Sequence, residues 1–298
     1  MDKIIFGDNQ FFGVNHKSEH IAITQSKKFQ TADDIYKTLQ YVNDIGIKSF
    51  MFSTHSQLEP VFEKIKTDSK FYDFKLYPCM PYAHKYANAM LDLGPFEMIN
   101  KFVPGNKFMT GLKGVGSLIT ANPIPIMQLL VDSEMKLLKG MNVQGIFLLN
   151  IVTDLLLGLE MHELLYEFSN YCKMKYNVKA GFFTMNHVKL YDVLVNKLGL
   201  KDPIIVSGIN KIGFRMNPSK KEVEKILEKN DSYNIAMSFL ASGALNPKEA
   251  SDYIESIKGV SSVVFGASSC EHIKETKEIL DSIFKVSNWA NKSLLEVS

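Results

Sequence analysis

Short runs of apolar residues alternate with stretches in which apolar residues recur every three or four positions, along almost the whole chain. Eight of the runs are apolar enough to be strands that are buried on both faces. They are 3–7, 48–53, 74–79, 145–150, 179–184, 203–208, 234–239 and 262–267. Eight strands that alternate with helices predict an α/β fold, the (β/α)8 TIM barrel. Because periodicity cannot show closure of the sheet, a doubly wound open sheet is the alternative.

Signals for the start of a helix stand between the predicted strands. Thr31 followed by Asp34 predicts a capping box. Asn122, Asn217 and Asn246 each precede a proline, and an Asn-Pro pair suits the cap and the first position of a helix. The amphipathic stretches that we expect to be helices include 33–45, 126–140, 220–230 and 248–257.

Two connections are longer than the ~2–6 residues usual between a strand and the following helix. They are 8–30, after the first predicted strand, and about 80–121, after the third. Both leave the carboxyl ends of strands, where barrel enzymes build their active sites, so both are candidate lids. We therefore expect a single barrel domain over residues 1–298, with an inserted lid-like segment at about 80–121.

Charge and cysteine content narrow the classes of partner. The 34 basic and 32 acidic residues are spread through the chain, so no surface for nucleic acid or for an anionic membrane is expected. The first ten residues do not resemble a signal peptide, and the most apolar run, 146–159, is too short and too polar for a membrane span. Three cysteines without CxxC spacing argue against a disulfide framework. We expect a cytoplasmic protein whose partner is a small molecule, with the oligomeric state open.

The last third of the chain carries a resemblance to a known family. The segments IAMSFLASGAL (235–245) and NPKEASDYIESIKGVSSVVFGASSCEHIKETKEIL (246–280), and more weakly GFFTMNHVKLYDVLVNKLG (181–199), resemble the last strands and helices of the aldo-keto reductases. The resemblance implies a (β/α)8 barrel and NADP as cofactor. Carried over residue by residue, it implies that the phosphates and adenosine of NADP would lie at Ser238, Leu240, Ser242, Gly243, Gly266, Ser268, Ser269, His272 and Glu275.

A physical argument supports the second half of that set. The stretch GASSCEHIKE (266–275) places serine hydroxyls and free N–H groups at the start of a helix, which attracts phosphate. The alternative is that Ser268 or Ser269 only caps this helix.

The catalytic positions of the family are different here. Aldo-keto reductases use Asp, Tyr, Lys and His around the carbonyl, and these positions fall in MFSTHSQ (51–57), near Cys79 and on Asn150. The pair that would hold the nicotinamide amide falls on Phe183 and Thr184, and the aromatic under the ring falls on Ile209. The resemblance therefore leaves hydride transfer open.

Polar residues nevertheless follow six of the predicted strands, which is more than a packed barrel needs. Asp8 is the best candidate for a general acid or base, with an Asx-turn as the alternative. Together with groups from the next two strand ends, it supplies the side-chain types that the family's catalytic positions lack. The candidate catalytic residues are Asp8, His55, Cys79, Tyr82, His84 and Lys85, and the candidate substrate-binding residues are Asn9, Asn150, Asn186, Asn210 and Arg215.

Several of these candidates have a simpler interpretation. A free cysteine at an apolar strand end, as Cys79 is, commonly packs as a small hydrophobe. His84 and Lys85 suit a solvated first turn of a helix. Arg215 is the single arginine beside 33 lysines, and its planar fork suits a phosphate or carboxylate, although a surface arginine is the alternative. HELLY at 162–166 lacks the second histidine of a zinc motif, and we expect no metal site.

These observations predict a barrel enzyme with a divergent active site, acting on a phosphorylated or nucleotide-linked small molecule such as a sugar derivative. The substrate is expected to be anionic. The alternatives are a non-redox isomerase, epimerase or lyase on the same class of substrate, and a catalytically silent barrel that binds a ligand.

Overall fold

The computed structural model describes residues 1–12, 28–81 and 123–286. Eight parallel strands form a closed barrel in chain order, and the last strand pairs with the first. The strands are β1 (Ile4–Phe6), β2 (Ser49–Ser53), β3 (Lys75–Met80), β4 (Gly145–Leu148), β5 (Lys179–Phe183), β6 (Ile204–Gly208), β7 (Tyr233–Met237) and β8 (Val260–Phe265). All eight predicted strands are present, so the predicted barrel is confirmed and the open sheet is wrong.

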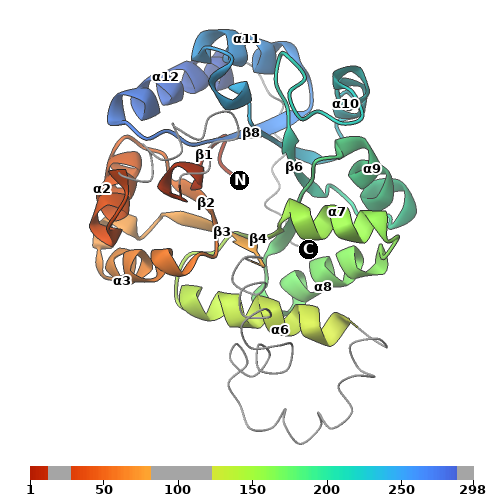
Figure 1. Ribbon diagram of the computed structural model, residues 1–298, viewed down its shortest axis with the longest axis horizontal. Coiled ribbons are helices and arrows are strands. Elements are labelled where there is room, and N and C mark those ends of the chain that lie inside the picture. The colour runs from red at the N-terminus through yellow and green to blue at the C-terminus, as the bar shows by residue number, and fades with distance from the viewer. Residues whose placement is uncertain (13–27, 82–122, 287–298) are drawn as a thin grey trace, which may run out of the picture.

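Helices surround the barrel in a ring (Figure 1). They are α2 (Ala32–Asp44), α3 (Glu59–Thr67), α6 (Ile124–Met135), α7 (Asn150–Gly158), α8 (Glu163–Tyr176), α9 (His187–Tyr191), α10 (Lys220–Leu227), α11 (Pro247–Ser256) and α12 (Cys270–Val286). A π-helix at Asp192–Lys197 continues α9. In the described part of the chain, no helix is long and apolar enough to cross a membrane. The lid-like segment predicted at about 80–121 lies almost wholly outside the described residues.

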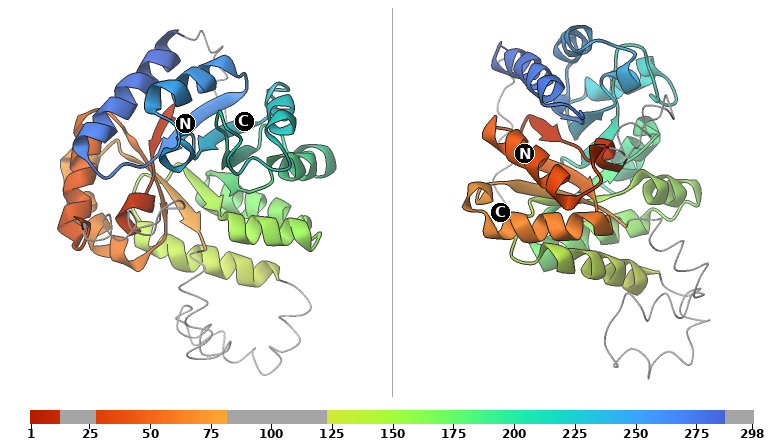
Figure 2. Two further views of the ribbon diagram at one scale, coloured as in Figure 1. Left: turned by 45° about the horizontal axis from the view of Figure 1, so that its top comes forward. Right: turned by 60° about the vertical axis from the view of Figure 1, so that its left-hand side comes forward.

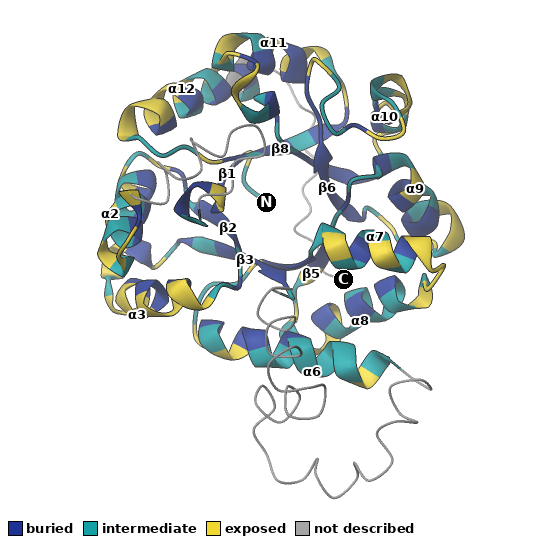
Figure 3. Cartoon of the chain, viewed as in Figure 1, coloured by how far each residue is buried: buried dark blue, intermediate teal, exposed yellow. Residues whose placement is uncertain are grey.

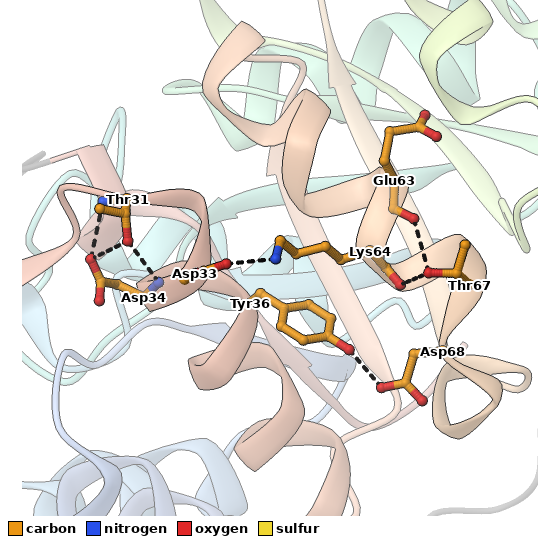
Figure 4. Close-up of polar contacts among 8 residues, drawn as sticks. All are labelled: Thr31, Asp33, Asp34, Tyr36, Glu63, Lys64, Thr67 and Asp68. Atoms are coloured by element: carbon orange, nitrogen blue, oxygen red, sulfur yellow. Dashed lines mark hydrogen bonds and ion pairs between the residues drawn. The ribbon is translucent and has the colours of Figure 1, made fainter.

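Two of the helix starts form as the sequence predicts. Thr31 caps α2: its hydroxyl accepts a hydrogen bond from the Asp34 backbone N–H at 3.3 Å, and the Asp34 carboxylate accepts one from the Thr31 N–H at 3.0 Å (Figure 4). This is the predicted capping box. Asn246 caps α11, and Pro247 occupies the first helical position.

The prediction at Asn217 and Pro218 is wrong. Helix α10 begins at Lys220, and its cap is Ser219, whose hydroxyl accepts from the Glu222 N–H at 3.3 Å. The side chain of Asn217 instead donates to the carbonyl of Met185 at 2.9 Å, which ties the loop after β6 to the loop after β5. Asn122 lies outside the described residues.

Polar contacts also join neighbouring helices of the ring. The Lys64 ammonium of α3 lies 2.6 Å from the Asp33 carboxylate of α2, and the Tyr36 hydroxyl donates to Asp68 at 2.7 Å (Figure 4). These contacts lie near the surface, and they orient the two helices rather than supplying much stability.

Alternation along the strands divides the apolar residues into two cores. In β1 to β3, Ile5, Met51 and Tyr77 belong to a small core inside the barrel. Their neighbours in sequence point outward into a larger core beneath the helices, which includes Phe50 and Phe52. Figure 3 shows the strands buried and the outer faces of the helices exposed, and Figure 2 shows the same layering from two further sides. Because the inside is filled, a ligand can reach only the ends of the barrel.

Candidate functional site

The carboxyl ends of the strands form the mouth of the barrel, and the centre of this mouth is apolar. Leu149, Phe183, Met237 and Val264 are partly exposed and pack on the small inner core. A ligand at this end would therefore rest on a non-polar floor. The polar groups available to it stand around this floor, at the ends of the individual strands.

Asp8 lies directly after β1 and is 8% exposed. Its carboxylate accepts a hydrogen bond from the Ser53 backbone N–H, at the end of β2, at 2.6 Å. Burial raises the pKa of Asp8 to about 6, although this hydrogen bond works in the opposite direction. A carboxyl with such a pKa can both take up and release a proton near neutral pH.

Cys79 projects into the barrel from β3, close enough to Asp8 to feel its charge. Burial raises the pKa of the Cys79 thiol well above its ordinary value, and the charge of Asp8 raises this pKa further. The thiol lies 3.6 Å from the carbonyl of Tyr77 and packs in the inner core. A thiol in this setting stays protonated, and the geometry favours its interpretation as a small hydrophobe.

His55 stands at the end of β2 with its ring engaged in local contacts. Its Nδ1 accepts a hydrogen bond from the Gln57 N–H at 3.1 Å, and the ring stacks on Phe12 with centroids 4.4 Å apart. Phe12 ends the short helix η1 (Asn9–Phe12), which follows Asp8. The stack therefore links the segment after β1 to the end of β2, beside Asp8.

Sequence reasoning selected Asn9 after β1, but the neighbouring residue Gln10 is the buried one. Asn9 is exposed, whereas Gln10 is 3% exposed and its Nε2 donates to the carbonyl of Gly7 at 2.7 Å. The Oε1 atom lies against Gly266 at the end of β8, where a Cβ would approach it to 2.0 Å. Among the described residues this buried Oε1 has no hydrogen-bond partner. Only the closed barrel, which places β8 beside β1, reveals this contact.

The three asparagines proposed to bind substrate have different positions. Asn150 is the first residue of α7 and is partly exposed. Asn186 caps α9, where its side chain accepts from the Lys189 N–H at 3.1 Å. Asn210 is fully buried, and its amide bonds both the N–H and the carbonyl of Phe214 at 2.8 Å. Asn186 and Asn210 thus serve the backbone around them, and only Asn150 has its side chain free of such a bond.

The loop after β6 presents Arg215 at the rim of the mouth. Gly208 ends β6, and a Cβ there would meet the Arg215 carbonyl oxygen at 2.9 Å, so the backbone at 215 occupies the place of a side chain. Arg215 itself has a φ of +57°, which a residue with a side chain rarely adopts. Its guanidinium lies over the Phe214 ring, 5.3 Å from the centroid. In the described part of the chain, no carboxylate pairs with this guanidinium.

The loops after β7 and β8 carry the positions that the reductase resemblance assigns to phosphate and adenosine. Ser238 and Ser242 have φ values of +54° and +57°. Ser269 caps α12, because its hydroxyl accepts from the His272 N–H at 3.2 Å. Within the described residues, the hydroxyls of Ser238, Ser242 and Ser268 form no hydrogen bond. The remaining positions are Leu240, partly buried against the core, and Gly243, Gly266, His272 and Glu275, all exposed.

The positions that would hold a nicotinamide do not fit that group. Thr184 is fully buried, and its hydroxyl donates to the Asp154 carboxylate at 2.5 Å and accepts from the Asn186 N–H at 2.8 Å. Phe183 offers no hydrogen bond, and Ile209 is fully buried. The loops after β7 and β8 retain hydroxyls that form no hydrogen bond among the described residues. At Phe183, Thr184 and Ile209, by contrast, the nicotinamide amide finds no free partner and Ile209 offers no aromatic face.

The remaining polar groups are either structural or not described. His187, at the start of α9, is 1% exposed, and its Nδ1 lies 2.8 Å from the Ser207 hydroxyl. This contact lies between the sheet and the helices, outside the interior of the barrel. Tyr82, His84 and Lys85 lie outside the described residues, so their proposed place near Asp8 stays a prediction. Among the described residues, no group of three His, Cys, Asp or Glu side chains could hold a metal ion.

Comparison with solved structures places the fold beside the aldo-keto reductases. PA4992 of Pseudomonas aeruginosa, a protein assigned to the aldo-keto reductases, superposes with a TM-score of 0.58 at 11% identity, over 95% of this chain and 91% of that one. A second structure of an assigned aldo-keto reductase from this organism gives 0.59 at 10% identity over the same shares. Gox0644 in its apo form gives 0.53 at 9% identity, over 97% and 91%.

No protein-family model matches the sequence, and no curated protein matches it. The likeness at 9–11% identity is one of fold. The resemblance noted in the sequence is therefore confirmed for the barrel, while activity has to be argued from the residues at its mouth.

Proposed function

We propose that the protein is an enzyme that transfers protons, as an isomerase, epimerase or lyase, on a phosphorylated or nucleotide-linked small molecule such as a sugar derivative. Asp8 carries the proposal. It is a buried carboxyl at the mouth of the barrel, with a pKa of about 6, and its carboxylate accepts a hydrogen bond from the Ser53 N–H. Ionising a buried carboxyl lowers the stability of the folded protein. Buried carboxyls with a strongly raised pKa are common at functional sites.

The chemistry that suits Asp8 is the removal and return of one proton. Its carboxylate would take a proton from a carbon beside a carbonyl, which leaves an enediolate on the substrate. The neutral acid would then return the proton to the former carbonyl carbon while the hydroxyl proton passes from one substrate oxygen to the other, which completes an isomerisation. In a lyase it would instead protonate the leaving oxygen as the C–O bond breaks, and an epimerase would need a second acid on the other face of the carbon. The apolar floor of Leu149, Phe183, Met237 and Val264 would exclude water around this carbon.

The part of the mouth formed by the loops after β6, β7 and β8 offers partners for an anion. The loops after β6, β7 and β8 supply the Arg215 guanidinium and the hydroxyls of Ser238, Ser242 and Ser268. These strands are consecutive in the barrel, and β8 adjoins β1, which carries Asp8. Barrel enzymes frequently bind phosphate after the seventh and eighth strands. This arrangement supports a substrate whose phosphate lies at the loops after β6 to β8 and whose reacting carbon lies at the neighbouring Asp8.

The proposal is tested by proton exchange with solvent, which requires no knowledge of the product. The protein is incubated in D2O with a panel of aldose and ketose phosphates, and NMR follows the loss of carbon-bound protons. We expect exchange in at least one phosphorylated sugar and much slower exchange in the same sugar without phosphate. No exchange in the whole panel would favour the silent, ligand-binding barrel.

The poor fit of the nicotinamide leads to a separate prediction. In a fluorescence titration, NADPH is expected to show no blue shift of its nicotinamide emission at concentrations up to several hundred micromolar. The physical reason is that Thr184 is already bonded to Asp154 and Ile209 is buried. Saturable NADPH binding in the low micromolar range would restore the redox interpretation of the barrel.

Arg215 provides a prediction about the anion. Changing Arg215 to Lys is expected to raise the KM of the exchanging substrate about tenfold, and Arg215 to Ala about a hundredfold, because the ammonium cannot reproduce the bidentate fork. The control is Lys201 to Ala, an exposed cation before β6, which should leave KM unchanged. Equal KM values for the wild type and both Arg215 variants would show that this guanidinium is solvated.

A further inference from the structure

A cavity of about 370 Å³, widely open to solvent, lies beside the amino ends of β4 and β5, away from the mouth of the barrel. Residues 138–141 and Val143 precede β4, Val178 precedes β5, and both segments line this cavity. The ends of helices α6 and α8, which lie side by side in Figures 1 and 2, supply the rest of its wall.

One wall of this cavity is held rigidly by hydrogen bonds. The Asp132 carboxylate of α6 accepts from the hydroxyls of Tyr171 and Tyr176 of α8, each at 2.7 Å, and from the Lys175 ammonium at 2.5 Å. Lys175 also lies over both tyrosine rings. These contacts hold the pKa of Asp132 below its ordinary value despite partial burial. The single acidic group of the lining is therefore already neutralised by its neighbours.

The rest of the lining combines an apolar floor with two cations. The floor consists of Met135, Leu138, Met141, Val143 and Val178. Lys136 and Lys139, at the end of α6 and of the short helix η5 (Lys136–Leu138), stand at the rim and are exposed. Neither lysine pairs with a carboxylate among the residues that the structure describes. The carbonyls of Lys136 and Leu138 accept from Lys139 and Met141, so they are satisfied within the turn.

We propose that this cavity binds a small amphipathic monoanion, of which a medium-chain fatty acid is the simplest example. The hydrocarbon chain would lie on the apolar floor, which would remove part of its surface from water. The carboxylate would lie at the rim between Lys136 and Lys139. The charges of the lining favour an anion as the ligand. Lys136 and Lys139 pair with no carboxylate among the described residues, whereas the Asp132 carboxylate is already bonded to its neighbours. The site is separate from the proposed active site and does not depend on it.

The test is calorimetric titration of the full-length protein with octanoate, with octan-1-ol as the uncharged analogue. We expect one octanoate per chain and at least tenfold weaker binding of octan-1-ol. The double variant Lys136→Glu/Lys139→Glu should weaken octanoate binding more than tenfold. The matched control is Lys221→Glu/Lys225→Glu on the exposed side of α10, which changes the net charge equally.

A second variant tests the apolar floor independently. Val178→Trp fills the cavity with a bulky ring and should remove octanoate binding, while circular dichroism and the thermal midpoint report whether the fold persists. Equal binding of octanoate and octan-1-ol, equal affinities of the two lysine double variants, or no octanoate binding at millimolar concentration would each overturn the proposal.

Discussion

Replacing Asp8 by asparagine is expected to reduce the rate of proton exchange by a factor of about 10²–10⁴ and, at the same time, to stabilise the folded protein above pH 6. The amide keeps the size of the side chain and an oxygen that can accept from the Ser53 N–H. It cannot take up a proton at neutral pH. The exchange assay in D2O, run with the substrate found in the panel, measures the loss.

The gain in stability follows from the raised pKa. The carboxyl of Asp8 titrates at about 6 in the folded protein and near 3.8 when unfolded. Because the folded value is the higher one, the stability that this group contributes is lost as the pH rises from about 4 to 6. The difference of about two pKa units amounts to about 3 kcal/mol at pH 7.5. Asp8→Asn avoids this cost.

The measurement is urea unfolding of the wild type and Asp8→Asn at pH 7.5 and at pH 4. We expect the variant to be more stable by up to about 3 kcal/mol at pH 7.5 and by much less at pH 4. Asp252→Asn, on the exposed side of α11, is the control and should change neither activity nor stability appreciably. A variant that keeps its exchange activity, or one that is less stable at pH 7.5, would contradict the role given to Asp8.

The second large effect concerns His187. Folding lowers the pKa of this residue, whereas it raises the pKa of Asp8. Burial lowers the pKa of His187 to about 4, from 6.5 in the unfolded chain. Because the folded value is the lower one, the unfolded state takes up a proton first as the pH falls. The folded protein should therefore lose about 3 kcal/mol of stability between pH 6.5 and pH 4 through this residue alone.

Substituting His187 by Asn removes the titration while the side-chain amide can still bond the Ser207 hydroxyl. Other groups titrate over the same range, so the informative quantity is the difference in the free energy of unfolding between variant and wild type at pH 7 and at pH 4.5. This difference should shift in favour of the variant by about 2–3 kcal/mol on acidification. The control is His272→Gln, at an exposed position on α12. Its free energy of unfolding should change between pH 7 and pH 4.5 by the same amount as that of the wild type. A constant difference across this range would show that His187 is not responsible.

Part of the candidate site could be found from the sequence. Asp8 follows a short apolar strand, and the rule that barrel enzymes act at the carboxyl ends of strands was sufficient to select it. Arg215 was selected because it is the single arginine. The type of side chain and its place after a strand carried the information in both cases, and neither depends on which strands are neighbours.

Other residues of the site depended on contacts between distant segments. Gln10 lies against Gly266, across the junction of the first and last strands. The hydroxyl of Thr184 is bonded to Asp154 of helix α7, and this bond, more than the identity of either residue, makes the position unsuitable for a nicotinamide. Asn210 carries a side chain typical of a binding site, but its amide serves the backbone of Phe214. No local pattern distinguishes these cases.

The sequence by itself determined the number and order of the strands and their alternation with helices, because each of these elements depends on residues within about a dozen positions. Alternating apolar runs, the Thr31 capping box and the Asn246 cap are local properties of this kind. The tertiary structure alone decided that the sheet closes, that Asp8 is desolvated to a pKa of about 6, and that Arg215 stands at the mouth without a carboxylate partner among the described residues. Desolvation and the choice of partner are sums over neighbours that are distant in the chain, and these neighbours are brought together only when β8 pairs with β1.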